Sequence, residues 1–290
     1  MRVKDFRNKA ELLDYLDDKA MELRKQVIDL SMVSTGGHLG GAFSMMDIVV
    51  ALYYHTLKVD PHNPTWAGRD RFVLSKGHGA IAYVPILADL GFFPKEWLST
   101  FNKLDSPFGM HPDMHKIPGV EMSTGSLGHG LSIAVGMALS ARLDKQDSRI
   151  FVLMGDGELN EGMVWEAAQA GSHFKLGNIV AIVDRNRFSL DGPTEEIMSI
   201  EPIRDRWEAF GWKVYDIDGH DMEALVDTFN GLPPASGNTP ILVIARTTKG
   251  KGVDFMENNP IYHYTLLDKK SALDAFASIE RSRPARRVTI

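Results

Sequence analysis

Short apolar runs alternate along this chain with longer segments that have helical spacing. The runs lie at residues 71–74, 150–154, 179–183, 212–217 and 241–245. Strands that are apolar almost throughout are typical of parallel sheets covered on both faces. The alternation therefore predicts an α/β fold, with a doubly wound, mostly parallel sheet and helices on both of its faces.

The longer segments predict the helices. In residues 8–33, apolar side chains such as Leu12, Leu16 and Leu23 recur at steps of three and four, which indicates an amphipathic helix. Ser44 is a suitable N-cap for the next helix. The further helices are expected at about 44–57, 80–90, 94–103, 131–143, 161–174 and 222–229. We expect a single domain over residues 1–290, with a tail from Arg281 that is mobile or docked on a partner.

Polar residues follow two of the predicted strands. Gly155-Asp156-Gly157 comes directly after one strand, and Asn186 comes thirty residues after Asp156, at the end of the next. That spacing fits one strand–helix–strand crossover, so both side chains reach the same edge of the sheet. One carboxylate and one amide, with a backbone carbonyl near Phe188, suit a hard cation that bridges to a diphosphate. The alternative is a plain glycine turn and a loop asparagine, but the strands on both sides favour the metal site.

Several histidines lie in irregular segments beside glycine or proline. His38, His78 and His111 have this setting, which suits hydrogen bonding to a polyhydroxylated substrate or proton transfer near neutral pH. His263 carries a weaker signal. Lys249 lies in a glycine-rich loop after a strand, where it is either a phosphate ligand or a solvated lysine. Four other histidines are set aside, because a lone histidine is more often structural or on the surface than catalytic: His55, His62, His115 and His173.

Composition narrows the class of protein. The formal net charge is −6, and Lys and Arg are interleaved with Asp and Glu, which argues against a nucleic-acid surface. The absence of cysteine excludes disulfides, a thiolate nucleophile and a cysteine zinc site. No window approaches the ~20 apolar residues that a membrane span needs, and the first residues do not resemble a signal peptide. A cytoplasmic protein is the expectation.

Taken together, these segments resemble the thiamine diphosphate enzymes, and the match to the N-terminal part of transketolase runs along almost the whole chain. The most specific element is Gly155-Asp156-Gly157 with Asn186, which is similar to the family's cofactor motif. Three further transketolase-like phrases lie at residues 71–78, 119–128 and 191–195.

The resemblance implies how this chain holds its cofactor. Asp156, Asn186 and the Phe188 carbonyl would hold Mg²⁺ or Ca²⁺ against the diphosphate of thiamine diphosphate, with Gly155 and Gly157 at the same site. By the same similarity, His78 contacts the diphosphate side, assisted by Lys249. Gly125 and Leu127 would lie against the thiamine rings.

The resemblance also implies substrate contacts. His38, His111 and His263 match histidines that bind the hydroxyl groups of the donor ketose and assist proton transfer. Glu161 matches a buried glutamate that communicates across a subunit interface. Two phrases depart from the family: Gly37-His38-Leu39-Gly40 replaces Gly-His-Pro-Gly, and Tyr262-His263-Tyr264 replaces Trp-His-Gly.

The length of the match indicates a divided enzyme. Full transketolases carry two further domains, and the glutamate that activates the aminopyrimidine belongs to the second. We therefore expect a transketolase N-terminal subunit that works with a separate C-terminal subunit, in a heterotetramer of two plus two. It would transfer a two-carbon ketol unit from a ketose, or its phosphate, to an aldose, as in the pentose phosphate pathway.

Three alternatives stay open: a ketol transferase for an unusual sugar, an enzyme similar to deoxyxylulose phosphate synthase, and a cofactor-binding module without catalysis. His111-Pro112-Asp113 favours transketolase over the synthase. The three candidate substrate histidines count against a non-catalytic module.

Overall fold

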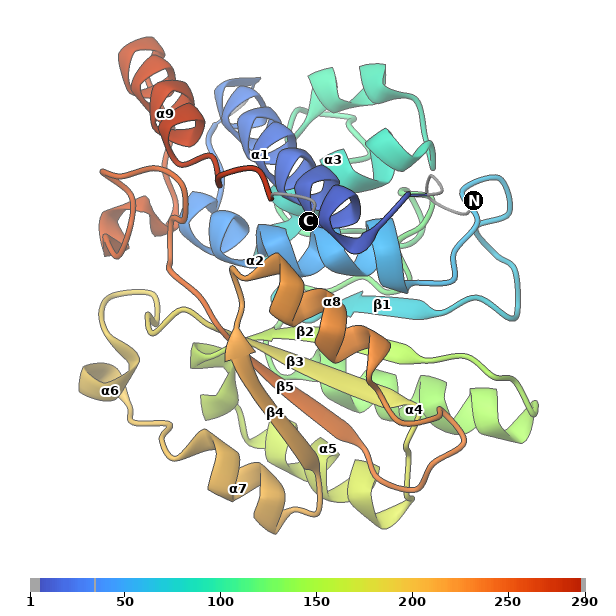
Figure 1. The fold of residues 1–290 in the computed structure, drawn as a ribbon. Coiled ribbons are helices and arrows are strands. Elements are labelled where there is room, and N and C mark those ends of the chain that lie inside the picture. The colour runs from blue at the N-terminus through green and yellow to red at the C-terminus, as the bar shows by residue number, and fades with distance from the viewer. Residues whose placement is uncertain (1–5, 34, 288–290) are drawn as a thin grey trace.

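A computed structural model describes residues 6–33 and 35–287. Five parallel strands form one sheet in the order β1-β2-β3-β5-β4 (Figure 1). The strands are β1 Arg71–Leu74, β2 Ile150–Gly155, β3 Ile179–Arg185, β4 Lys213–Asp218 and β5 Ile241–Arg246. The predicted α/β fold is confirmed.

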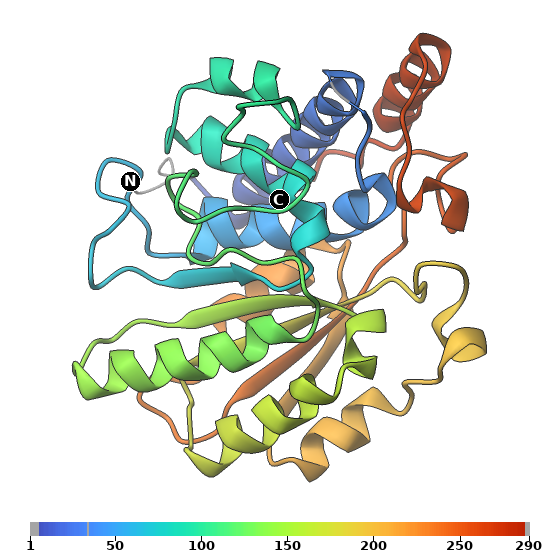
Figure 2. The same cartoon turned by 180° about the vertical axis from the view of Figure 1, so that it is seen from behind.

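Helices cover both faces of the sheet (Figures 1 and 2). One layer contains α1 Lys9–Val33, α2 Leu39–Ala51, α3 Ala80–Leu90 and α8 Met222–Asn230, and the opposite layer contains α4 His129–Leu143, α5 Gly162–His173 and α7 Ile203–Ala209. In β3, Val180 and Ile182 pack into the first layer, whereas Ala181 and Val183 pack into the second. Burial of both faces explains why the central strands are apolar at every position.

The second predicted helix is wrong in its bounds. It begins at Leu39 rather than Ser44 and ends at Ala51, followed by a π turn over Leu52–Thr56. Ser44 is therefore not an N-cap but a buried interior residue whose hydroxyl donates to Asp184. Every residue of α2 is buried, so no apolar stripe marks where it starts. The helix expected at 94–103 is instead a short 3-10 segment, Lys95–Thr100.

Three helices were not predicted: α6 Thr194–Ile197, α7 Ile203–Ala209 and α9 Lys269–Arg281. The chain after α9 was expected to be mobile or bound to a partner, but through residue 287 it lies along α1 of its own chain. Its arginines pair with aspartates of that helix; these residues are Arg283, Arg286 and Arg287 with Asp14, Asp17 and Asp18. Within the described ranges, no helix has the length and apolar character to cross a membrane.

Candidate active site

The carboxyl ends of the five strands point to one edge of the sheet, where the polar loops converge (Figure 1). Gly155 is level with Asp184 on the neighbouring strand, and Arg185 is level with Arg246 on the strand beyond. Asp156, Asn186 and Thr247 are therefore the first residues past three adjacent strands. The 30-residue crossover does bring Asp156 and Asn186 to the same edge.

Asp156 and Asn186 each hold a backbone amide of the loop that follows β3. Asp156 Oδ2 accepts from the Arg187 amide at 2.5 Å, and Asn186 Oδ1 accepts from the Phe188 amide at 3.1 Å. Asp156 Oδ1 accepts from the Gly157 amide at 2.8 Å. Consecutive amides thus fix both side chains beside each other and next to Phe188.

The electrostatics around Asp156 suit a bound cation. Asp156 is 1% exposed, and its burial, together with the nearby Asp184 carboxylate, raises its pKa to about 6. The Arg185 guanidinium, 3.1 Å from Oδ2, only partly offsets this rise. Throughout the described ranges, no three His, Asp or Glu side chains are arranged to hold a metal. A cation here would therefore combine one carboxylate with amide and carbonyl oxygens, a donor set that Mg²⁺ and Ca²⁺ accept.

Four predicted histidines come together at the same edge, although they are spread over more than 220 residues of the chain. The ring centroid of His38 lies 5.2 Å from that of His78, 5.2 Å from that of His263 and 6.4 Å from that of His111. His78 and His263 are 5.5 Å apart. Tyr264, from the phrase that departs from the family, packs edge-on against His38 at 5.0 Å.

These imidazoles are neutral near pH 7. Burial, followed by the charges of His111 and Lys76, lowers the pKa of His38 to about 4. Burial and the Lys249 ammonium lower the pKa of His263 to about 3. A neutral imidazole has one donor and one acceptor nitrogen. The cluster can therefore both donate to and accept from sugar hydroxyl groups.

Lys249 joins the histidines to the Asp156 region. Its Nζ lies 3.1 Å from His263 Nδ1, 3.4 Å from the Ser189 carbonyl oxygen and 5.7 Å from the centre of the Phe188 ring. Burial, aided by the charge of Lys76, lowers the pKa of Lys249 to about 8. An ammonium held in this position would meet an anion beside the predicted cation.

The loop that contains Gly125 and Leu127 is tied to the end of β1. The Thr124 hydroxyl donates to the Leu74 carbonyl at 2.6 Å, and a Cβ on Gly77 would lie 2.7 Å from Thr124. Gly125, with φ of +155°, lies against the His111 ring, where a Cβ would come within 3.0 Å of Cγ. Gly125 therefore borders the histidine cluster. Leu127 follows in the same loop and is half-buried.

A buried ion pair that was not among the predicted site residues lies beneath the site. Lys76 Nζ lies 2.6 Å from Asp184 Oδ2, and both side chains are 1% exposed or less. Asp184 also accepts from Ser44, Thr247 and the Asn186 amide group. Burial by itself would raise the pKa of Asp184, but Lys76 and these donors hold it below its ordinary value. Strand alternation was an available signal, because Val180, Ile182 and Asp184 share one face of β3.

Glu158 is buried in this chain, whereas Glu161 is exposed. The Glu158 carboxylate accepts from the Gly128 amide at 2.9 Å, from the Gly155 amide at 3.0 Å and from the Ser75 hydroxyl. Glu161 lies at the N-cap of α5. The predicted role of Glu161 at a subunit interface stays a prediction.

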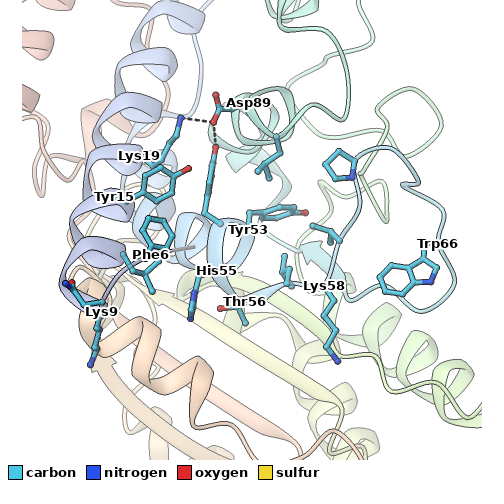
Figure 3. A pocket seen from close by; sticks show the side chains of 17 residues that line it. Phe6, Lys9, Tyr15, Lys19, Tyr53, His55, Thr56, Lys58, Trp66 and Asp89 are labelled. Carbon is cyan, nitrogen blue, oxygen red and sulfur yellow. Dashed lines mark hydrogen bonds and ion pairs between the residues drawn. The ribbon is translucent and has the colours of Figure 1, made fainter. Parts of the chain in front are cut away.

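The large cavity shown in Figure 3 lies away from this edge. It has a volume of about 1040 Å³ and is bordered by α1 and by residues 53–59 and 61, with Tyr54 bonded to Asp89 at its wall. None of the predicted site residues lines it. The set-aside His55 borders this cavity and bonds to Asn230.

The family model described as the transketolase thiamine diphosphate-binding domain matches residues 17–274. The chain therefore belongs to this family, whose fold binds thiamine diphosphate.

Within the family, the chain is similar to proteins named as single subunits of transketolases. One is a subunit of the apulose-4-phosphate transketolase of Phocaeicola vulgatus, which is 43% identical over 87% of this chain and 89% of that protein. Another is the 6-deoxy-6-sulfo-D-fructose transketolase subunit SqwG of a Clostridium species, which is 40% identical over 92% of this chain and 96% of that protein.

Full-length transketolases show the same fold over less than half of their length. The crystal structure of the Campylobacter jejuni transketolase superposes with a TM-score of 0.85 at 33% identity, and the match covers 91% of this chain. The matched part is only 42% of that transketolase chain.

The ion pair beneath the site yields a prediction about stability. Lys76→Met leaves the Asp184 carboxylate buried without its cation and should lower the free energy of unfolding by about 3–5 kcal/mol. Arg246→Met breaks a pair with Asp216 in which the arginine is 45% exposed, and should cost no more than about 1 kcal/mol. Urea unfolding of both variants measures the difference. Equal losses of unfolding free energy in the two variants would show that the buried Lys76–Asp184 pair stabilises the protein no more than the exposed pair does.

Proposed function

We propose that this chain is the cofactor-binding subunit of a two-chain transketolase, which moves a two-carbon ketol unit from a ketose to an aldose. The observation that carries the proposal is the extent of the match. The match to this chain covers 89% and 96% of the length of two proteins named as transketolase subunits, but only 42% of the length of a full-length transketolase. A separate subunit with the remaining domains would complete the enzyme, in a heterotetramer of two plus two.

The proposed cofactor contacts lie at the edge described above. Asp156, Asn186 and the Phe188 carbonyl would hold Mg²⁺ or Ca²⁺, and Gly155, Gly157, His78 and Lys249 would face the diphosphate. The Asn186 amide nitrogen donates to Asp184 and Ser44, so Oδ1, which accepts from the Phe188 amide, faces the loop. When bound, thiamine diphosphate supplies the carbanion chemistry. The protein contributes binding, orientation and charge.

The proposed substrate contacts are the neutral histidines. His38, His111 and His263 would hold hydroxyl groups of the donor and move protons at its oxygens, because each neutral ring has one donor and one acceptor nitrogen. Gly125 and Leu127 would lie against the thiamine rings, and Glu161 would lie at an interface between subunits. The gathering of four histidines favours catalysis over a module that only binds cofactor.

The names of the relatives shape the choice of sugars to be tested. They refer to apulose 4-phosphate and to 6-deoxy-6-sulfo-D-fructose, neither of which is a standard pentose phosphate. We therefore propose a ketose with an acidic group at its far end as the donor. The groups that bind that acid would come largely from the partner subunit.

The divided site predicts that neither subunit works alone. Ketol transfer should be at least about 100-fold faster with this chain and its C-terminal partner together than with either of the two separately, because the partner supplies the missing proton-transfer group. Rates are measured with thiamine diphosphate, Mg²⁺ and the two named sugars or xylulose 5-phosphate as donor. Full activity of this chain alone would refute the divided site.

The proposed cation site predicts a specific loss of cofactor. Asp156→Ala should weaken Mg²⁺-dependent binding of thiamine diphosphate to the assembled complex by about 100-fold or more, since a ligand is lost outright and even outer partners cost 10–100-fold. The matched control is Asp274→Ala, on the exposed side of α9. Calorimetry with Mg²⁺, and again with a chelator, measures both. An unchanged affinity in Asp156→Ala would remove this residue from the site.

The lowered pKa of Lys249 predicts a pH dependence. The ammonium is charged below about pH 8 and loses its proton above it, so affinity for thiamine diphosphate should fall between pH 7.5 and 9. Lys249→Arg stays charged over this range and should hold its affinity, with a difference at pH 9 of roughly tenfold or more. Binding titrations at both pH values test this. Parallel pH curves for the two proteins would exclude Lys249 as an anion contact.

A further inference from the structure

His220, which follows β4, uses both of its ring nitrogens. Nδ1 lies 2.7 Å from Asp47 Oδ2, and Nε2 lies 2.8 Å from the backbone nitrogen of Thr248. It therefore links α2, which contains Asp47, to the loop that follows β5.

The two bonds define one tautomer. A backbone amide can only donate, so Nε2 of His220 must be the unprotonated acceptor. Nδ1 then carries the proton and donates to the Asp47 carboxylate. The ring is neutral, and its orientation and tautomer are both set by its partners.

Asp47 is itself held rigidly. Arg24 of α1 donates to its two oxygens at 2.8 and 2.7 Å, in the bidentate geometry that gives strong, directional pairing. The same guanidinium donates to the Phe43 carbonyl at 3.1 Å. Arg24 and Asp47 are each 6% exposed. His220 is thus anchored to the helical layer behind the site.

On its other side, His220 holds a peptide between two site residues. Thr248 lies between Thr247, whose hydroxyl donates to Asp184, and Lys249, which contacts His263. The β4 and β5 loops also touch directly. The Gly219 amide donates to the Arg246 carbonyl at 2.8 Å, and a Cβ on Gly219 would lie 2.6 Å from Thr247 Cγ2.

We propose that His220 is a positioning residue of the cofactor site. By accepting from the Thr248 amide, it fixes the peptide that directs Thr247 toward Asp184 and Lys249 toward the diphosphate side. The inference rests on the proposed function insofar as Lys249 meets the diphosphate. The hydrogen bond and its effect on the loop do not depend on that function.

Two isosteric substitutions separate the two bonds of the ring. In His220→Gln, the amide oxygen reaches the position of Nε2 and can still accept from Thr248. In His220→Asn, the amide group lies near the position of Nδ1 and can still donate to Asp47, but nothing accepts from Thr248. If the side chain only filled space, His220→Gln would not preserve the loop better than His220→Asn. His62→Asn, at an exposed loop histidine, is the matched control.

The first measurement is amide hydrogen exchange at Thr248 and Lys249 in the full chain, without cofactor. In His220→Asn, we expect these amides to exchange about tenfold faster than in wild type, which is the factor expected for the loss of one hydrogen bond. In His220→Gln and His62→Asn, their exchange rates should stay within about threefold of the wild-type rates. The ¹⁵N shifts of the His220 ring should show a proton on Nδ1. A proton on Nε2, or equal exchange in His220→Asn and His220→Gln, would overturn the proposal.

The second measurement is the affinity of the assembled two-subunit complex for thiamine diphosphate with Mg²⁺. His220→Asn should bind about tenfold more weakly, and His220→Gln close to wild type. Faster exchange without weaker binding would overturn the link to the cofactor. If the wild-type complex transfers no ketol unit, the proposed function fails, whereas the exchange and ring-shift results still decide the role of His220.

Discussion

The buried ion pair between Lys76 and Asp184 is the interaction on which the rest of the site depends. Two charges taken out of water are stable only when they are close and when their remaining hydrogen-bonding capacity is satisfied. Here they are 2.6 Å apart, and the Gly41 carbonyl, Ser44, Thr247 and Asn186 supply the other partners. These partners come from α2 and from the ends of β3 and β5. One polar cluster therefore joins a helical layer to the strand ends and sets the orientation of the Asn186 amide.

The same cluster determines the charge that a ligand would meet. Desolvation, with smaller contributions from neighbouring charges that include Lys76 and Lys249, lowers the pKa values of His38 and His263 far below neutrality. On the other side of Lys249, burial and the nearby Asp184 carboxylate raise the pKa of Asp156 to about 6. The edge of the sheet thus combines neutral hydrogen-bonding rings, a cation and a carboxylate that favours a positive partner. That combination suits a cofactor with both a diphosphate and a bound metal.

A shared loop connects these features. The segment after β5 contains Thr247, which completes the ion-pair cluster, and Lys249, which reaches the histidines. Its middle amide is held by His220, which is anchored in turn by Asp47 and Arg24. A displacement of this one peptide would affect both the buried pair and Lys249. The site is thus organised by contacts well behind the side chains that face the ligand.

Much of the fold, and the list of candidate ligands, could be predicted because the signals are local. Strands buried on both faces need apolar residues at successive positions, and one crossover spans about thirty residues, so the parallel sheet and the meeting of Asp156 with Asn186 follow from short stretches of sequence. The glycine settings of His38 and His78 are local too.

Only the tertiary structure decided which polar residues are buried partners of one another. Ser44 bonds Asp184 across 140 residues, and His220 bonds Asp47 across 173. No local pattern encodes such a pairing, which is why Ser44 was mistaken for a helix cap and His220 was given no role. The start of α2 was missed for a related reason: a helix that is buried all round has no polar face to mark its ends. The sequence determined the sheet and the candidate ligands, and long-range packing decided how they are held.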